Sequence, residues 1–206
     1  TPTIAWTAPE QAGVVELRAT MTVQGGGQAI QVFSVEVSPS FFQGGLPTGL
    51  RTPRRVAAAP SGELAVADGS GQLWLLTKLG GLRAKPAMTD AVVAVAAAPG
   101  AFYASTARGS ILKVDLASGK VVARYQLGLS QGPSGLAWDA ARNLLWMTHR
   151  AAGAVQAIRP DGSSAVTITA AGAAELRNPY DVAVDATTGT VWVTQDANVD
   201  GAMVHA

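Results

Sequence analysis

Asp196, Asn198 and Asp200 have the residue types and the spacing of a calcium-binding loop. Residues 196–201 read DANVDG, which fits the pattern D-x-[DN]-x-[DN]-G. Alternate side chains in such a loop place oxygen ligands around a hard cation, and the glycine permits a sharp turn. The alternative interpretation is a hairpin turn of Asp, Asn and Gly, which needs no metal. Calcium is the cofactor that this pattern suggests.

His149 is the second candidate, because an imidazole can act as a general base or bind a metal ion. It ends the apolar run LLWMTH, in a position that Asp68, Thr106 and Gln195 occupy in three similar runs. If these runs meet at one rim of the fold, His149, Asp68 and Gln195 supply part of a catalytic or metal site. The alternative is a structural histidine that is hydrogen-bonded to a neighbouring element.

A phrase that returns four times predicts the elements that position these residues. It reads VAAAP at Val56 and at Val95, LAWD at Leu136 and VAVD at Val182, with steps of 39, 41 and 46 residues. After each phrase come a turn, a second apolar run, a short loop with glycine and a third run. Such a period is typical of a β-propeller, in which each repeat forms one small sheet called a blade. The repeats predict three blades and a truncated fourth within residues 54–206.

The first 37 residues have a different pattern. Apolar residues alternate with polar ones on both sides of a GGG sequence at residues 25–27, which predicts antiparallel strands joined by a glycine hairpin. Residues 38–53 are rich in Pro, Gly and Ser and have no period, so we interpret them as a linker. The expected organisation is therefore strands in residues 1–37, a linker in 38–53 and propeller blades in 54–206.

Two resemblances support this division. The sequences GPSGLAWD, NPYDVAVD and VDLASGKVV, at residues 132–139, 178–185 and 114–122, resemble NHL and YVTN-type propeller repeats. The W-x-A-P-x-x-x-G phrase of Trp6 to Gly13 is similar to one that precedes the final hairpin of bacterial immunoglobulin-like domains. The resemblances imply an all-β chain, in which a partial β-propeller follows an incomplete immunoglobulin-like β-sandwich segment.

Charge and composition exclude several classes of function. The formal net charge is +1 and the basic residues are scattered, so the chain lacks a basic stripe for nucleic acid. The longest uncharged run, residues 91–107, contains Pro99 and Gly100 and is too short to predict a transmembrane segment. The sequence contains no cysteine, which excludes disulfides and thiolate metal sites within these residues.

These patterns predict a non-catalytic recognition or scaffold segment of a larger secreted or cell-surface bacterial protein. Its partner would be another protein or the remaining segments of a larger polypeptide, outside the cell or, alternatively, in the periplasm. Propeller families also include metal-assisted lyases and lactonase-type hydrolases, for which His149, Asp68 and Gln195 would lie at the ring mouth. A second alternative is an accessory subunit of a surface electron-transfer assembly.

Overall fold

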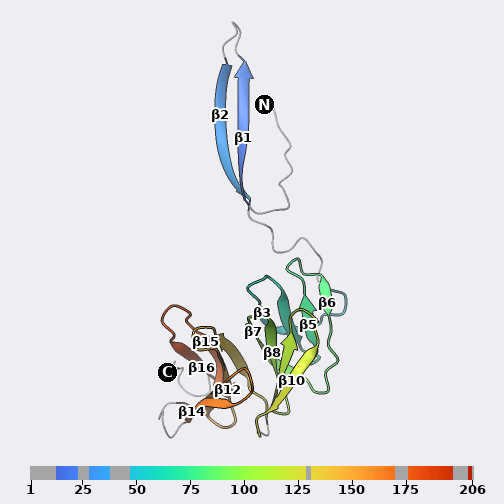
Figure 1. Cartoon of the computed structure of the whole chain (residues 1–206), viewed down its shortest axis with the longest axis vertical. Coiled ribbons are helices and arrows are strands. Elements are labelled where there is room, and N and C mark those ends of the chain that lie inside the picture. The colour runs from blue at the N-terminus through green and yellow to red at the C-terminus, as the bar shows by residue number, and fades with distance from the viewer. Residues whose placement is uncertain are drawn as a thin grey trace. The chain divides into compact units, whose positions relative to one another are not determined.

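The computed structural model describes residues 13–22, 28–37, 47–128, 131–169, 176–196 and 204–205. The chain divides into two compact units, Thr1–Gln43 and Gly44–Ala206, so the division falls inside the predicted linker. The all-β prediction is confirmed, because the described residues form strands and turns with no helix among them (Figure 1). Within these segments, no helix is long and apolar enough to cross a membrane.

The first unit contains an antiparallel hairpin of two long strands. Strand β1 (Gly13–Thr22) pairs with β2 (Gln28–Val37), from Gly13 opposite Val37 to Thr22 opposite Gln28. The register places Leu17 opposite Phe33 and Arg18 opposite Val32. The hairpin itself agrees with the sequence pattern, while residues 6–12 of the W-x-A-P-x-x-x-G phrase lie outside the described residues.

The second unit consists of four antiparallel sheets, which we number in chain order. Within each sheet, the order of the strands in space follows their order in the sequence. Sheet 1 contains β3 (Pro53–Ala58), β4 (Leu64–Asp68), β5 (Leu73–Leu76) and β6 (Leu82–Ala84). Sheet 2 contains β7 (Val92–Ala98), β8 (Ala101–Thr106), β9 (Ser110–Asp115) and β10 (Val121–Gln126).

The remaining strands repeat this arrangement. Sheet 3 contains β11 (Gly135–Asp139), β12 (Leu144–His149), β13 (Ala154–Ile158) and β14 (Ser164–Thr169). Sheet 4 contains β15 (Pro179–Val184), β16 (Val191–Gln195) and β17 (Val204–His205). The recurring phrase therefore supplies the first strand of each sheet, namely β3, β7, β11 and β15.

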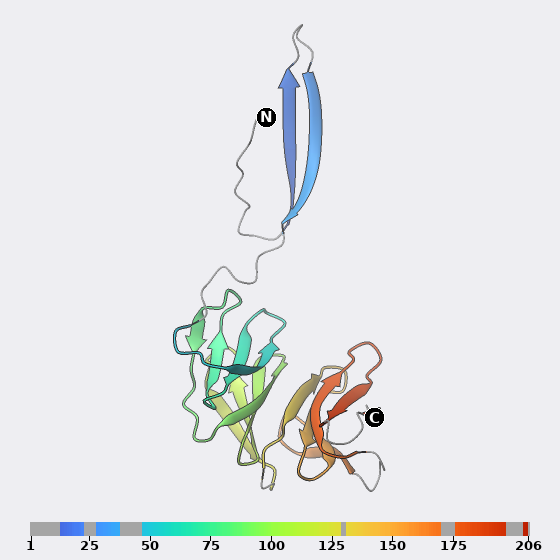
Figure 2. The same cartoon turned by 180° about the vertical axis from the view of Figure 1, so that it is seen from behind.

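The first strands lie side by side, and the apolar core lies between successive sheets. Contacts join β3 to β7, β7 to β11 and β11 to β15, and the sheets follow one another in chain order (Figure 2). Ala65 and Leu73 of sheet 1 share a cluster with Val95 of sheet 2. Strand β7 is apolar on both faces because the preceding sheet covers one face, at Val95, and the following sheet covers the other, at Ala94 and Ala96.

On one face of sheet 1 the first strand is left open at Val56, while Val66 and Trp74 on the same face are buried. Val95, Leu136 and Val182 are 6%, 7% and 6% exposed, because each packs against the preceding sheet, whereas the equivalent Val56 is 66% exposed. Leu50 packs on the same face of sheet 1 against Trp74, but it leaves Val56 uncovered.

Candidate functional site

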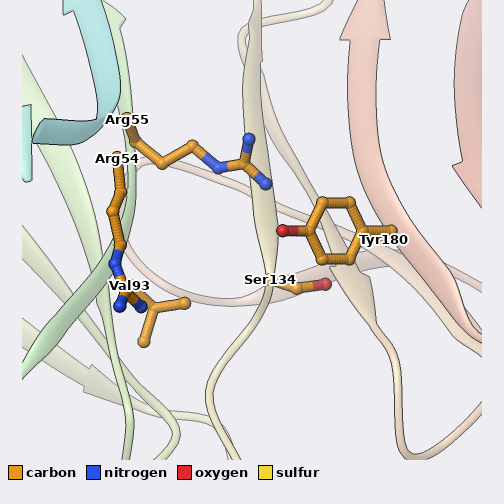
Figure 3. Close-up of a pocket in the computed structure, with 5 residues that line it drawn as sticks. All are labelled: Arg54, Arg55, Val93, Ser134 and Tyr180. Carbon is orange, nitrogen blue, oxygen red and sulfur yellow. The ribbon is translucent and has the colours of Figure 1, made fainter. Parts of the chain in front are cut away.

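A pocket of about 330 Å³ lies where the first strands of the four sheets come together. Its lining residues come from every sheet of the second unit (Figure 3). They are Arg54 and Arg55 of β3, Val93 of β7, Ser134 just before β11, and Tyr180 of β15.

Four of these residues occupy the same position in the four repeats. Each lies two residues before the first apolar residue of the recurring phrase; these residues are Arg54, Val93, Ser134 and Tyr180. The repeat thus directs one side chain from each sheet into a common space. Since the four residues are a cation, an aliphatic group, a hydroxyl and a phenol, a repetitive backbone builds a chemically varied pocket.

β-bulges determine which side chains reach this space. The pairing between first and second strands shifts register across Arg54, Val93 and Tyr180, which are the residues skipped in sheets 1, 2 and 4. A bulge leaves one residue unpaired and redirects its side chain, and such bulges are frequent beside binding sites. In sheet 3 the N–H of Ser134 donates a hydrogen bond to the carbonyl of Thr148, at 3.0 Å.

Buried hydroxyls hold the walls of the pocket together. Thr148 Oγ1 accepts a hydrogen bond from the N–H of Gly135 at 2.9 Å and donates one to the carbonyl of Tyr180 at 3.1 Å. It also lies 3.0 Å from Ser134 Oγ. Ser105 does the same one sheet earlier, accepting from the N–H of Ala94 at 3.0 Å and donating to the carbonyl of Pro133 at 2.8 Å. Each hydroxyl therefore joins its own sheet to the next.

The pocket carries an excess of positive charge. Arg55 forms an ion pair with Asp181, at 3.2 Å between Nη1 and Oδ2, and its guanidinium lies 5.1 Å from the centre of the Tyr180 ring. For Arg54 the described residues supply no hydrogen bond, ion pair or ring contact. The Tyr180 hydroxyl points into the space between the two arginines (Figure 3). Two guanidinium groups and one carboxylate leave a net charge of one positive unit.

Asp68, which the sequence suggested as a site residue, is a structural carboxylate. It is 2% exposed and ends β4. Its oxygens accept bonds from the N–H and hydroxyl of Ser70, from the N–H of Gln72 and from the indole of Trp74, at 2.5 to 3.0 Å. Burial raises the pKa of Asp68, but these hydrogen bonds outweigh it and hold the pKa below its ordinary value. The carboxylate stays charged while its partners close the β4–β5 turn.

His149 is buried at the end of β12, at 6% exposed. Its Nε2 lies 3.1 Å from the Gln156 side-chain oxygen, and Nδ1 has no hydrogen-bond partner among the described residues. Burial lowers the pKa of His149, and the Gln156 hydrogen bond only partly offsets this effect. The imidazole is therefore neutral at pH 7.

Gln195 ends β16, and its side-chain oxygen accepts a hydrogen bond from the N–H of Arg177. Asp68, His149 and Gln195 thus end the second strands of three different sheets, as the sequence predicted. The hydrogen-bond partners of Asp68 and of His149 belong to their own sheets. In the described part of the chain, no group of three or more His, Asp or Glu side chains could hold a metal ion.

Of the predicted calcium ligands, only Asp196 lies within the described residues. It forms an ion pair with Arg150, and its N–H donates a hydrogen bond to the carbonyl of Asn178 at 3.1 Å. Asn198 and Asp200 lie outside the described residues, so the calcium loop stays a prediction.

Sequence reasoning missed all five residues of the pocket. The available signal was the position two residues before each phrase, which changes from Arg to Val, Ser and Tyr while the phrase itself begins with Val-Ala or Leu-Ala in every repeat. Where the residue type varies between otherwise similar repeats, the side chain is not needed for the packing that the repeats share. It was therefore the position to examine for binding.

Comparisons with known proteins find similar solved structures and leave the function open. No protein-family model and no curated protein matches this chain. A solved structure described as the crystal structure of the computationally designed Ika4 protein is similar, with a TM-score of 0.63 and 11% identity. The similarity covers 82% of this chain and 98% of that one. It is one of 1087 solved chains that match, and an architecture shared so widely does not select a function.

Proposed function

We propose that residues 54–206 are blades of an NHL/YVTN-type β-propeller that acts as a non-catalytic recognition or scaffold segment. In this proposal residues 1–37 are the final strands of an immunoglobulin-like domain, and the whole belongs to a larger secreted or cell-surface bacterial protein. The function is to bind a further antiparallel sheet of the same kind. A partner protein or another part of a larger polypeptide supplies that sheet.

The exposure of Val56 carries this proposal. The equivalent residues in sheets 2, 3 and 4 are each buried against the preceding sheet. An apolar side chain at position 56 therefore suits contact with a further sheet of the same kind. Val56 lies on β3, the edge strand of sheet 1. A large apolar side chain gains about 1.5–3 kcal/mol when it is fully buried. Covering Val56 therefore favours association.

The opposite side of the sheet series supports the same interpretation. Ser105 and Thr148 are fully buried because the next sheet covers them, whereas Thr194, at the same position in sheet 4, is exposed. The hydroxyl of Thr194 accepts a hydrogen bond from the N–H of Asp181 at 3.2 Å, as its two equivalents do within their sheets. Sheet 4 therefore keeps the hydroxyl that, in sheets 2 and 3, is covered by the following sheet.

The surroundings of the predicted site residues favour a structural role over catalysis. Asp68 uses both carboxylate oxygens to hold a turn and an indole, and His149 is buried against Gln156. A general base must reach a substrate proton, and neither group is presented to an open cavity by these contacts.

Thiol reactivity tests the proposal, because the natural sequence has no cysteine and a single introduced thiol is unique. Val56→Cys probes the open side, and Val122→Cys on β10 is the matched control, since Val122 is 57% exposed. In the protein as its own cells produce it, we expect the thiol at position 56 to react roughly ten times more slowly than the thiol at position 122. In the isolated 206-residue chain the two rates should be similar. Equal reactivity in the complete protein would contradict the proposal.

A further inference from the structure

We propose that the pocket of Arg54, Arg55, Val93, Ser134 and Tyr180 binds a small monocarboxylate. This inference goes beyond the proposed scaffold function, because it needs only side chains that this chain contains. It concerns a ligand site on the first strands, whose residues Arg54 and Arg55 precede Val56 on β3.

Arg54 is the group that binds the carboxylate. The guanidinium of Arg55 already pairs with Asp181, whereas that of Arg54 has no polar partner among the described residues. A guanidinium presents two parallel N–H groups that match the two oxygens of a carboxylate, and such charge-assisted pairs are among the stronger hydrogen bonds. One carboxylate balances the single excess positive charge of the pocket.

The same charge balance disfavours a doubly charged phosphate. Asp181 Oδ2 remains within 3.2 Å of Arg55, so the pocket keeps a carboxylate beside any anion that enters. A dianion would add a second negative charge that Arg54 alone does not neutralise, and like charges at close range oppose binding. The pocket is therefore matched to a monoanion.

One hydroxyl and one apolar side chain define the rest of the ligand. The Tyr180 hydroxyl points into the pocket and has no hydrogen bond with the described residues, so it can donate to a bound oxygen (Figure 3). Ser134 Oγ is already engaged, 3.0 Å from Thr148 Oγ1 and 3.3 Å from the carbonyl oxygen of Pro179. Val93 offers an apolar contact for a short hydrocarbon chain.

The size and rigidity of the pocket restrict the ligand further. A volume of about 330 Å³ lies at the lower end of the range of small-molecule pockets, which is about 300–1,000 Å³. Thr148 is fully buried and binds both Ser134 and the carbonyl of Tyr180, so these two lining residues are positioned before a ligand arrives. Preorganisation lowers the entropic cost of binding.

Binding of defined probes to the purified 206-residue chain tests the proposal by calorimetry. We expect butyrate to bind saturably, in roughly the millimolar range for so small a ligand, and its neutral isostere butyramide to show no binding. Arg54→Gln should weaken butyrate binding by about tenfold or more, since it removes a charge-assisted pair. The matched control is Arg108→Gln, which removes the same charge from a side chain that is 85% exposed, and should leave the affinity unchanged.

Two further binding measurements show whether the carboxylate comes from a protein side chain or from a free acid. A short peptide with blocked ends and one glutamate tests a protein side chain as the ligand, and butyrate represents a free acid. Whichever binds more tightly assigns the source, and both results support a carboxylate site. Inorganic phosphate is the competing anion, and tighter binding of phosphate than of butyrate would overturn the assignment.

The remaining outcomes are decisive as well. Tyr180→Phe removes one hydroxyl from the pocket and should weaken butyrate roughly threefold or more, which keeps the test open if Arg54→Gln lowers the melting temperature. The proposal is wrong if butyrate does not saturate, if butyramide binds equally well, or if both pocket variants bind butyrate like the parent chain.

Discussion

Burial sets the ionisation of His149. The ring is 6% exposed, it has one side-chain hydrogen bond, to Gln156, and its pKa is lowered because the charged form would lose hydration. For Asp68, burial also disfavours the charged form, but several hydrogen-bond donors stabilise the carboxylate more strongly, so the pKa is lowered and the group stays charged. Asp139 resembles it, accepting bonds from Arg142 and, at 3.4 Å, from the indole of Trp146. At the scale of residues, Asp68 and His149 are polar groups at the ends of inner strands, bonded to residues of the same sheet or its turn.

The lowered pKa of His149 predicts a loss of stability in mild acid. The unfolded chain takes up a proton near the ordinary histidine pKa of about 6.5, whereas the folded protein resists protonation until a lower pH. The contribution of His149 to stability is complete above about pH 6.5 and is lost as the pH falls through the folded pKa. Urea unfolding from about pH 7.5 to about pH 5 should show this decline.

His149→Gln is the variant that isolates the effect. It keeps a hydrogen-bonding side chain but does not titrate, so its stability should fall less over the same pH range than that of the parent chain. His205 and the carboxylates are common to both proteins and cancel in the comparison. An identical pH dependence in parent and variant would show that His149 is not the group responsible.

Close approach between successive sheets is the main feature at the scale of elements. Gly71 has a φ of +79°, and a Cβ at this position would lie 2.6 Å from the Cβ of Ala91. Its carbonyl accepts a hydrogen bond from the N–H of Val92 at 2.9 Å, which joins the β4–β5 turn to β7. Glycine is therefore required at Gly71 both for its backbone conformation and for the contact with the next sheet.

Gly71→Ala and Gly100→Ala separate these two requirements. Gly100 has a similar φ of +72°, but no atom lies within 4 Å of where its Cβ would be. Its substitution therefore measures only the cost of the positive φ for alanine. We expect Gly100→Ala to lower the free energy of unfolding by about 1 kcal/mol and Gly71→Ala by about 2–4 kcal/mol. Urea unfolding measures both values. Equal losses would mean that Ala91 moves aside without cost.

The succession of sheets is the feature of the second unit as a whole. Sheets 2 to 4 each bury one face against the sheet before them, so the same residue position is buried in these three sheets and exposed, at Val56, in sheet 1. A stack of this kind has two terminal faces, and their stability depends on what covers them.

Val95→Ala and Val56→Ala compare the same position in two environments. In the isolated chain, Val95→Ala should cost about 1.5–3 kcal/mol, because Val95 is 6% exposed between sheets 1 and 2. Val56→Ala should change the free energy of unfolding by less than about 0.5 kcal/mol, because Val56 is 66% exposed. A comparable loss for both would show that Val56 is covered even in the isolated chain.

The sequence by itself determined the elements. Turn residues and alternating apolar runs are local signals, so the repeat predicted where each sheet begins, and it placed Asp68, Thr106, His149 and Gln195 at equivalent positions. The structure has them as the last residues of β4, β8, β12 and β16. The hairpin of residues 13–37 followed from the same kind of local pattern.

Only the tertiary structure decided which side chains meet. Asp68 and His149 are equivalent in the repeat, yet each is bonded within its own sheet, because the ends of second strands belong to separate sheets. Arg54 and Tyr180 lie far apart in the sequence and line one pocket, because bulges redirect them and the first strands converge. Contacts between sheets depend on this convergence, and a repeat of local patterns carries no direct signal for it.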